Sequence, residues 1–294
     1  MTKKPRTVKR PDVRHGHLKF RSRGPFKCFL DSDGKSLRGV HKFIQQTVMH
    51  GANVHKVATR ESDPPTPDFH FRPTQPPRVT ANRRRGAPIK AGSKVDTQVE
   101  KVLQLRASLP RVRLLHDTEP EPMPLALLYH CRSRAAVDYT RAACLTEAQL
   151  TAVRNLRRQL LTETCSLLEC MDARQWVPLS AQTAVQLGKI GTACDIVIMD
   201  CKVNKVRVLE VKTGYTKYKT NGKHMAAPYS THLVSNYNEA LVQALLSHLA
   251  YCRHHPTRPV DDPYLVVVNQ NGVHGYLPPD WVVEGASQLV GRAH

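Results

Sequence analysis

Apolar and polar residues alternate through residues 176–213, and this period of two predicts a meander of three β-strands. Turn-forming residues separate the strands, and the apolar positions are rich in Val and Ile. A second strand signal lies at residues 264–276, where Asn271 and Gly272 stand between two apolar runs. An Asn-Gly pair in that setting predicts a tight hairpin turn.

Three other segments carry the spacing of amphipathic helices. The first covers residues 92–109 and the last covers residues 231–255. Between them, residues 145–171 form the clearest helical pattern, opened by Thr146 and Gln149 in the spacing of a capping box. The sequence therefore predicts an α/β protein in the order helix, helix, three strands, helix, strand. The short apolar run at residues 125–130 is compatible with either strand or helix.

Residues 1–90 differ in character from the remainder. Proline recurs there, with pairs at residues 64–65 and 76–77, and low hydrophobicity is combined with high charge. Such a composition argues against a separate packed domain. A single apolar patch, from Val40 to Val57, is compatible with a helix that docks on the core. We therefore expect a basic, flexible and largely irregular extension over residues 1–90, followed by a folded domain over residues 91–294.

Charge is distributed as unevenly as hydrophobicity. The chain has a formal net charge of +20, and residues 1–90 hold 21 Lys and Arg against 6 Asp and Glu. Clustered positive charge of this size favours a polyanion as partner, because each cation on a phosphate releases a condensed counterion. The alternative is a tail that serves only solubility or targeting. We favour nucleic acid, and DNA over RNA.

The cellular setting follows from what the chain does not contain. No apolar run reaches 18 residues, so we expect no membrane partner, and the N-terminus lacks the apolar region of a secretory signal. The eight cysteines form no CxxC pair, so reduced thiols are expected rather than a zinc or iron–sulfur site. The basic segment 3–10 is compatible with nuclear localisation. We expect an intracellular protein, in the nucleus or another DNA-containing compartment, and organelle targeting stays open.

Candidate chemistry lies in the second and third predicted strands. If their turn covers residues 201–204, pairing places residue 199 opposite 206, 197 opposite 208, and Asp195 opposite Glu210. Lys212 lies two residues beyond Glu210 and therefore faces the same side. Two carboxylates at cross-strand distance repel each other unless a cation lies between them, and Mg²⁺ or Mn²⁺ prefers such oxygen ligands.

This geometry suits metal-assisted hydrolysis of a phosphodiester. Asp195, Glu210 and the backbone carbonyl of Val211 are the expected metal ligands, and Asp96 on the first helix is a candidate extra ligand. Lys212 would orient or activate a water, or offset charge on the phosphate. The alternative is an ordinary charged surface face. We favour catalysis because these charges interrupt strands that are otherwise apolar, and a buried charge needs a partner or a metal.

The same residues resemble the PD-(D/E)XK nuclease superfamily. The segments GKIGTACDIVIMD and VLEVKTG are similar to the metal-binding core of its RecB and lambda-exonuclease branch. The segment GSKVDTQVEK matches that branch's G-x-x-x-H helix in position, with Asp96 in place of His. The Q-x-x-x-Y motif of the branch would begin at Gln243, where Ser247 follows four residues later and Tyr251 a turn after that.

The resemblance covers residues 91–280 and implies a restriction-endonuclease-like α/β core of order αβββαβ, with a mixed central sheet flanked by helices. It implies Asp195, Glu210 and Lys212 as catalytic residues, supported by Gln243 and Tyr251. Some relatives hold an iron–sulfur cluster through one upstream and three downstream cysteines. Here a single cysteine follows the motif, so no iron–sulfur cluster is expected.

We therefore expect a metal-dependent deoxyribonuclease in DNA processing, repair, replication or recombination, with exonuclease and endonuclease modes both open. The alternative is a non-catalytic nucleic-acid-binding or packaging protein on the same scaffold. We expect a polar loop over residues 215–229, whose mixed aromatic and basic residues suit stacking on bases and contact with phosphates. The expected nucleic-acid-binding residues are Lys189, Tyr215, Lys217, Lys219, Arg83, Arg84 and Arg85.

Overall fold

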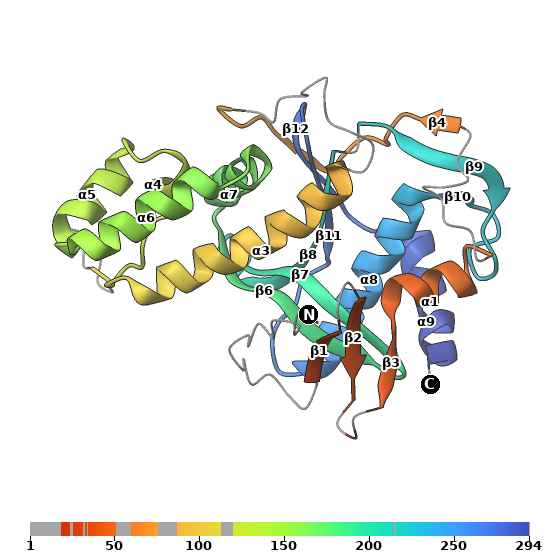
Figure 1. Ribbon diagram of the computed structural model, residues 1–294. Coiled ribbons are helices and arrows are strands. Elements are labelled where there is room, and N and C mark those ends of the chain that lie inside the picture. The colour runs from red at the N-terminus through yellow and green to blue at the C-terminus, as the bar shows by residue number, and fades with distance from the viewer. Residues whose placement is uncertain are drawn as a thin grey trace, which may run out of the picture.

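A mixed central sheet runs through the molecule, with helices on both of its faces (Figure 1). In the part of the chain that the structure describes, eight helices surround this sheet. The structure is a computed structural model, and it describes residues 19–23, 26–31, 33, 35–50, 60–75, 87–112, 120–214 and 216–293.

The sheet is mixed because two of its strand pairs are parallel and the others are antiparallel. β3 runs parallel to β7, and β8 runs parallel to β11. β6 pairs with β7 along nearly its whole length. The strands lie in the order β1 (Lys19–Arg23), β2 (Phe26–Leu30), β3 (Ser36–Gly39), β7 (Ile190–Asp200), β8 (Lys205–Thr213), β11 (Tyr264–Asn269), β12 (Gly272–Tyr276) and β5 (Phe69–Phe71), with β6 spanning Trp176–Leu187.

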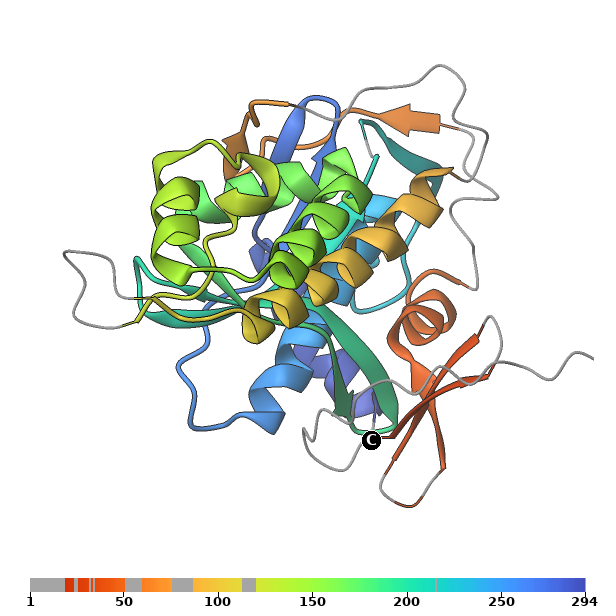
Figure 2. The ribbon, with the colours of Figure 1, turned by 60° about the vertical axis from the view of Figure 1, so that its left-hand side comes forward.

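Strand alternation divides the buried apolar residues between two cores. Val197 and Val208 enter one core, whereas their neighbours Ile196 and Leu209 enter the other. The first core is covered by α1 (Val40–Thr47), α8 (Asn236–His254) and α9 (Asp280–Ala293). The second is covered by α3 (Ala87–Ser108), α4 (Ala126–Tyr129), α5 (Arg134–Ala143), α6 (Glu147–Gln159) and α7 (Thr162–Arg174), which gather on the opposite side (Figure 2).

The N-terminal third contributes to the same fold. β3 pairs with β7 and β5 pairs with β12, so both belong to the central sheet. β4 (Arg60–Ser62) pairs with β9 (Tyr218–His224), which also pairs with β10 (Leu233–Ser235) in a small second sheet. The expectation of a largely irregular extension is therefore wrong for these segments. Their strands are short and gain their hydrogen bonds from partners over 100 residues away, which local pattern does not reveal.

The helix expected over residues 145–171 is two helices, and the single-helix prediction is wrong. The capping box of Thr146 and Gln149 is confirmed at the start of α6. The chain then breaks at Leu160, where the backbone is extended. The side chain of Gln98 on α3 binds both broken ends. Its amide nitrogen donates to the carbonyl of Gln159 at 2.7 Å, and its oxygen accepts from the N–H of Leu161 at 2.9 Å.

Three other expectations are settled by the backbone. The run at residues 125–130 contains the helix α4, and the segment 215–229, expected to be a polar loop, contains the strand β9. The hairpin signal at residues 264–276 is confirmed as the antiparallel pair β11 and β12. The terminal helix α9 follows and packs against α8; the hydrophobic pattern had not indicated it.

Candidate active site

The candidate site lies where β7 and β8 separate. Met199 lies opposite Val206 and Val197 opposite Val208, so the expected register is confirmed. The regular pairing ends at Ile196 and Leu209, one residue before Asp195 and Glu210. Beyond this point β8 continues beside β11. The separation leaves room for side chains to replace backbone hydrogen bonds between the two strands.

Asp195 bridges the gap between these strands with its carboxylate. One oxygen, Oδ2, accepts a hydrogen bond from the backbone N–H of Val211 at 2.9 Å. The other oxygen, Oδ1, accepts from Nε2 of Gln182 at 3.1 Å. Because both oxygens are held, the orientation of the half-buried carboxylate is fixed from β8 on one side and β6 on the other.

Glu210 is the most buried member of the site, with 1% of its surface exposed. Burial and the negative charge of Asp195 raise the pKa of Glu210 from 4.5 to about 8, although the cation of Lys212 opposes this rise. Nζ of Lys212 donates to Oε1 of Glu210 at 2.6 Å and to Oε1 of Gln243 on α8 at 3.3 Å. The structure therefore brings together Asp195, Glu210, Lys212 and Gln243.

The donors at this site match the requirements of Mg²⁺ or Mn²⁺. Two carboxylates lie close enough for one to raise the pKa of the other. The carbonyl of Val211 lies on the same edge of β8 as its N–H, which binds Asp195. Within the described ranges no group of three His, Cys, Asp or Glu side chains forms a metal site. Two carboxylates and a carbonyl suit an ion that retains several waters, so the residues fit.

Gln182 is a site residue that sequence reasoning missed. It occupies β6 directly across from Asp195, because Ala181 pairs with Ile196 and Thr183 with Cys194. Its φ is 52°, in the left-handed region that side-chain-bearing residues rarely adopt. Strained backbone of this kind tends to cluster at functional sites. The sequence carried little signal, because a glutamine in a polar position of a strand is ordinary.

Of the two expected supporting residues, Gln243 contacts Lys212, and Tyr251 lies eight residues further along α8. Tyr251 is buried, and its hydroxyl accepts a hydrogen bond from Arg258 at 3.2 Å. Ser247, four residues after Gln243, forms a hydrogen bond with Thr192 of β7 at 3.2 Å. Ser247 therefore fixes α8 on β7, whereas the hydroxyl of Tyr251 is engaged by Arg258, and the expected support from Tyr251 stays a prediction.

Asp96 is buried on α3, a helix that packs against β6 and β8. The structure does not gather it with Asp195 and Glu210 into a three-residue metal group within the described residues. Asp96 therefore stays a candidate extra ligand, as the sequence predicted.

The expected nucleic-acid-binding residues fall into two groups. Lys189, in the turn between β6 and β7, is exposed, as are Lys217 and Lys219 beside and on β9. The others lie outside the described residues: Arg83, Arg84, Arg85 and Tyr215.

Comparison with known proteins does not extend these observations. No protein-family model matches the chain, and no curated protein matches its sequence. Among the helices that the structure describes, none has the length and apolar character needed to cross a bilayer.

Proposed function

We propose that this protein is a metal-dependent nuclease that hydrolyses phosphodiester bonds of DNA. The observation that carries the proposal is the neighbouring carboxylates of Asp195 and Glu210 where two central strands separate, with Lys212 paired to Glu210. Burying ionisable groups costs free energy, and buried groups with shifted pKa values are common at functional sites. The chain order α3, β6, β7, β8, α8, β11 also supports a restriction-endonuclease-like core.

Each residue of the site has a defined task. Asp195, Glu210 and the carbonyl of Val211 would hold Mg²⁺ or Mn²⁺, which when bound supplies a Lewis acid and lowers the pKa of a bound water. Lys212, positioned between Glu210 and Gln243, places a cation where the phosphate gains negative charge. Gln182 keeps Asp195 in one orientation. Burial and Asp195 raise the pKa of Glu210, which favours its protonated form without a divalent cation, so cation binding would release a proton.

Cleavage assays with the purified protein test this proposal. Labelled single-stranded and double-stranded DNA are incubated with wild type and Glu210→Gln, with Mg²⁺, with Mn²⁺ or with EDTA. We expect cleavage only with wild type and a divalent cation, and loss of at least a hundredfold in Glu210→Gln. Glu147→Gln is the matched control, because Glu147 is an exposed carboxylate on α6. Equal cleavage by wild type and Glu210→Gln would contradict the catalytic assignment.

The basic N-terminal third favours a second candidate, a nucleic-acid-binding or packaging protein without catalysis. Residues 1–18 hold 6 Lys and Arg against 1 Asp. Deleting them is a cleaner test than deleting residues 1–90, which would remove β1 to β5. This candidate predicts steeply salt-dependent DNA binding that survives Asp195→Ala and weakens in the truncated chain. DNA binding that the truncation leaves unchanged would count against it.

A further inference from the structure

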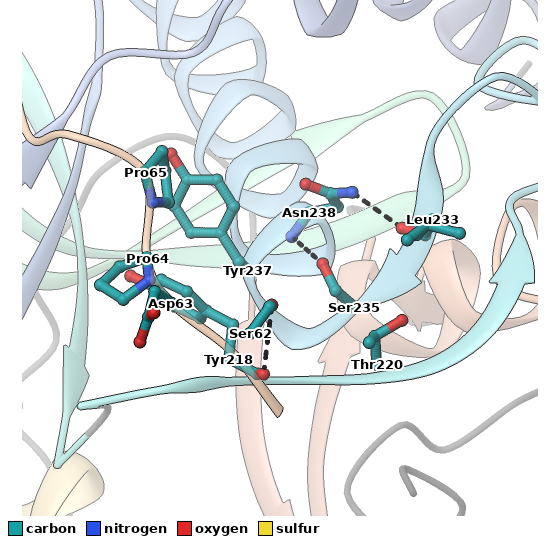
Figure 3. A pocket seen from close by; sticks show the side chains of 10 residues that line it. All are labelled: Ser62, Asp63, Pro64, Pro65, Tyr218, Thr220, Leu233, Ser235, Tyr237 and Asn238. Atoms are coloured by element: carbon teal, nitrogen blue, oxygen red, sulfur yellow. Dashed lines mark hydrogen bonds between the residues drawn. The ribbon is translucent and has the colours of Figure 1, made fainter. Parts of the chain in front are cut away.

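A cavity at the start of α8 is lined by aromatic, apolar and polar groups, one of them charged. It has a volume of about 350 Å³ and lies between the small second sheet and the first turn of α8 (Figure 3). Residues 62–65 form one wall of this cavity. Its remaining lining residues are Tyr218, Thr220, Leu233, Ser235, Tyr237 and Asn238.

The cavity shares helix α8 with the candidate site. Tyr237 stands six residues before Gln243 on α8, which is about 9 Å along the helix axis. Tyr218 opens β9, six residues after Lys212. The backbone N–H of Lys219 donates to Oδ1 of Asn236 at 2.8 Å and so ties β9 to the start of α8. A strand lying across the site would therefore pass this cavity within a few nucleotides.

The lining suits a nucleobase better than a phosphate. The rings of Tyr218 and Tyr237 lie 4.5 Å apart between centroids and give the cavity an aromatic side. The charged group among its lining residues is Asp63, whose carboxylate repels phosphate. Burial raises the pKa of Tyr237, so this side remains neutral. Flat, uncharged and polarisable ligands match such a surface.

The hydrogen-bonding groups of the cavity are largely engaged within the protein. The amide nitrogen of Asn238 donates to the carbonyl of Leu233 at 2.7 Å, and the hydroxyl of Ser235 accepts from the N–H of Asn238 at 3.0 Å (Figure 3). The hydroxyl of Thr220 donates to the carbonyl of Val234 at 2.9 Å. Few groups are left to read base edges, so recognition would rest on stacking and tolerate any sequence.

From this chemistry we propose that the cavity receives the base of an unpaired nucleotide. A base inside a duplex is stacked and paired, so it reaches a cavity only after unpairing. The substrate of the candidate site is therefore a single strand or an unpaired end. This inference rests on the proposed nuclease function, because it assigns a substrate class to the same site.

Binding of abasic strands separates base recognition from phosphate contact. Glu210→Gln in EDTA is titrated against a fluorescent 12-mer of thymidylate, an abasic 12-mer of equal charge, and a hairpin duplex, with anisotropy as readout. We expect the thymidylate strand to bind about tenfold more tightly than the abasic strand, since stacking on an aromatic ring is commonly of this size. Equal affinities for the two strands would overturn the proposal.

Two variants and one control variant locate the effect. Tyr237→Ala removes the ring, and Tyr237→Phe keeps it and controls for loss of the hydroxyl. Leu233→Trp fills the cavity from a residue that is 41% exposed, so folding is preserved. We expect Tyr237→Ala and Leu233→Trp to abolish the preference for bases and leave abasic binding unchanged. A preference that survives Leu233→Trp would refute the assignment.

The outcomes also separate this inference from the nuclease function. If Glu210→Gln stops cleavage but the thymidylate and abasic strands bind with equal affinity, the nuclease function is supported and the base-binding role of the cavity is excluded. If the thymidylate strand binds more tightly than the abasic strand but wild type with a divalent cation does not cleave DNA, the base-binding role of the cavity is supported and the nuclease function is excluded.

Discussion

Removing the carboxylate of Glu210 should stabilise the metal-free protein, and more so as pH rises. Burial and Asp195 raise the pKa of Glu210 in the folded state to about 8, against 4.5 for the free side chain. Between these values the unfolded chain has lost a proton that the folded protein still holds. The stabilising contribution of protonated Glu210 is therefore complete below pH 4.5 and is lost as pH rises toward 8. The side chain introduced by Glu210→Gln does not titrate, so the stability of this variant lacks this pH dependence.

The magnitude follows from the slope of proton linkage. One proton held only by the folded state changes the unfolding free energy by about 1.4 kcal/mol per pH unit. From pH 5 to pH 7, the stability of Glu210→Gln minus that of wild type should rise by about 3 kcal/mol. Titrating groups that do not interact with Glu210 cancel in this difference because both proteins share them.

Urea unfolding in EDTA at pH 5, 6 and 7 measures this difference. Glu147→Gln serves as control, since its carboxylate is on the surface of α6 and paired with Arg154. The difference in unfolding free energy between Glu147→Gln and wild type should stay nearly constant from pH 5 to pH 7. Adding MgCl₂ at pH 7 should stabilise wild type more than Glu210→Gln, because a cation replaces the proton. A difference for Glu210→Gln that does not change with pH would refute the reasoning.

Three further predictions concern packing and positioning. Gln98→Leu should cost about 1–3 kcal/mol of unfolding free energy, because both ends of the break between α6 and α7 lose their partner; urea unfolding measures it, and an unchanged midpoint would contradict it. Gly275→Ala should cost about 1–3 kcal/mol, because the added Cβ would lie 1.8 Å from a ring carbon of Phe69. Gly39→Ala, with open space around the new Cβ, should lack that penalty in the same assay. Gln182→Gly keeps the left-handed backbone but frees Asp195, so cleavage should require about tenfold more Mg²⁺ and recover when the cation saturates; an unchanged Mg²⁺ requirement would exclude the positioning role.

The part of the site that could be predicted from the sequence depends on strand parity. A two-residue period forces Asp195 and Glu210 to neighbouring positions once the turn is located, and the observed register agrees. The position of Lys212 beside Glu210 follows from the same rule. The role of Gln182 could not be predicted from the sequence, because it depends on a left-handed backbone angle and on the position of a third strand.

The fold shows the same division between local and distant causes. Helix α6 begins where its capping box predicts, because both partners lie within four residues. It ends at a point set by Gln98, more than 60 residues earlier in the chain. The strands β3 and β5 likewise form because they pair with distant strands of the sheet. They are only four and three residues long, which is too short for an alternating pattern to predict them.

The position of β5 has a consequence for the order of folding. Its partner β12 is about 200 residues later, so nearly the whole chain must be synthesised before this sheet edge can close. Until then the ring of Phe69 cannot form the edge-to-face contacts with Trp176 and Tyr264 that it has in the native state. Contacts of such long range form slowly and leave apolar segments open to aggregation. The excess of Lys and Arg over Asp and Glu in residues 1–90 should oppose association between nascent chains during this interval.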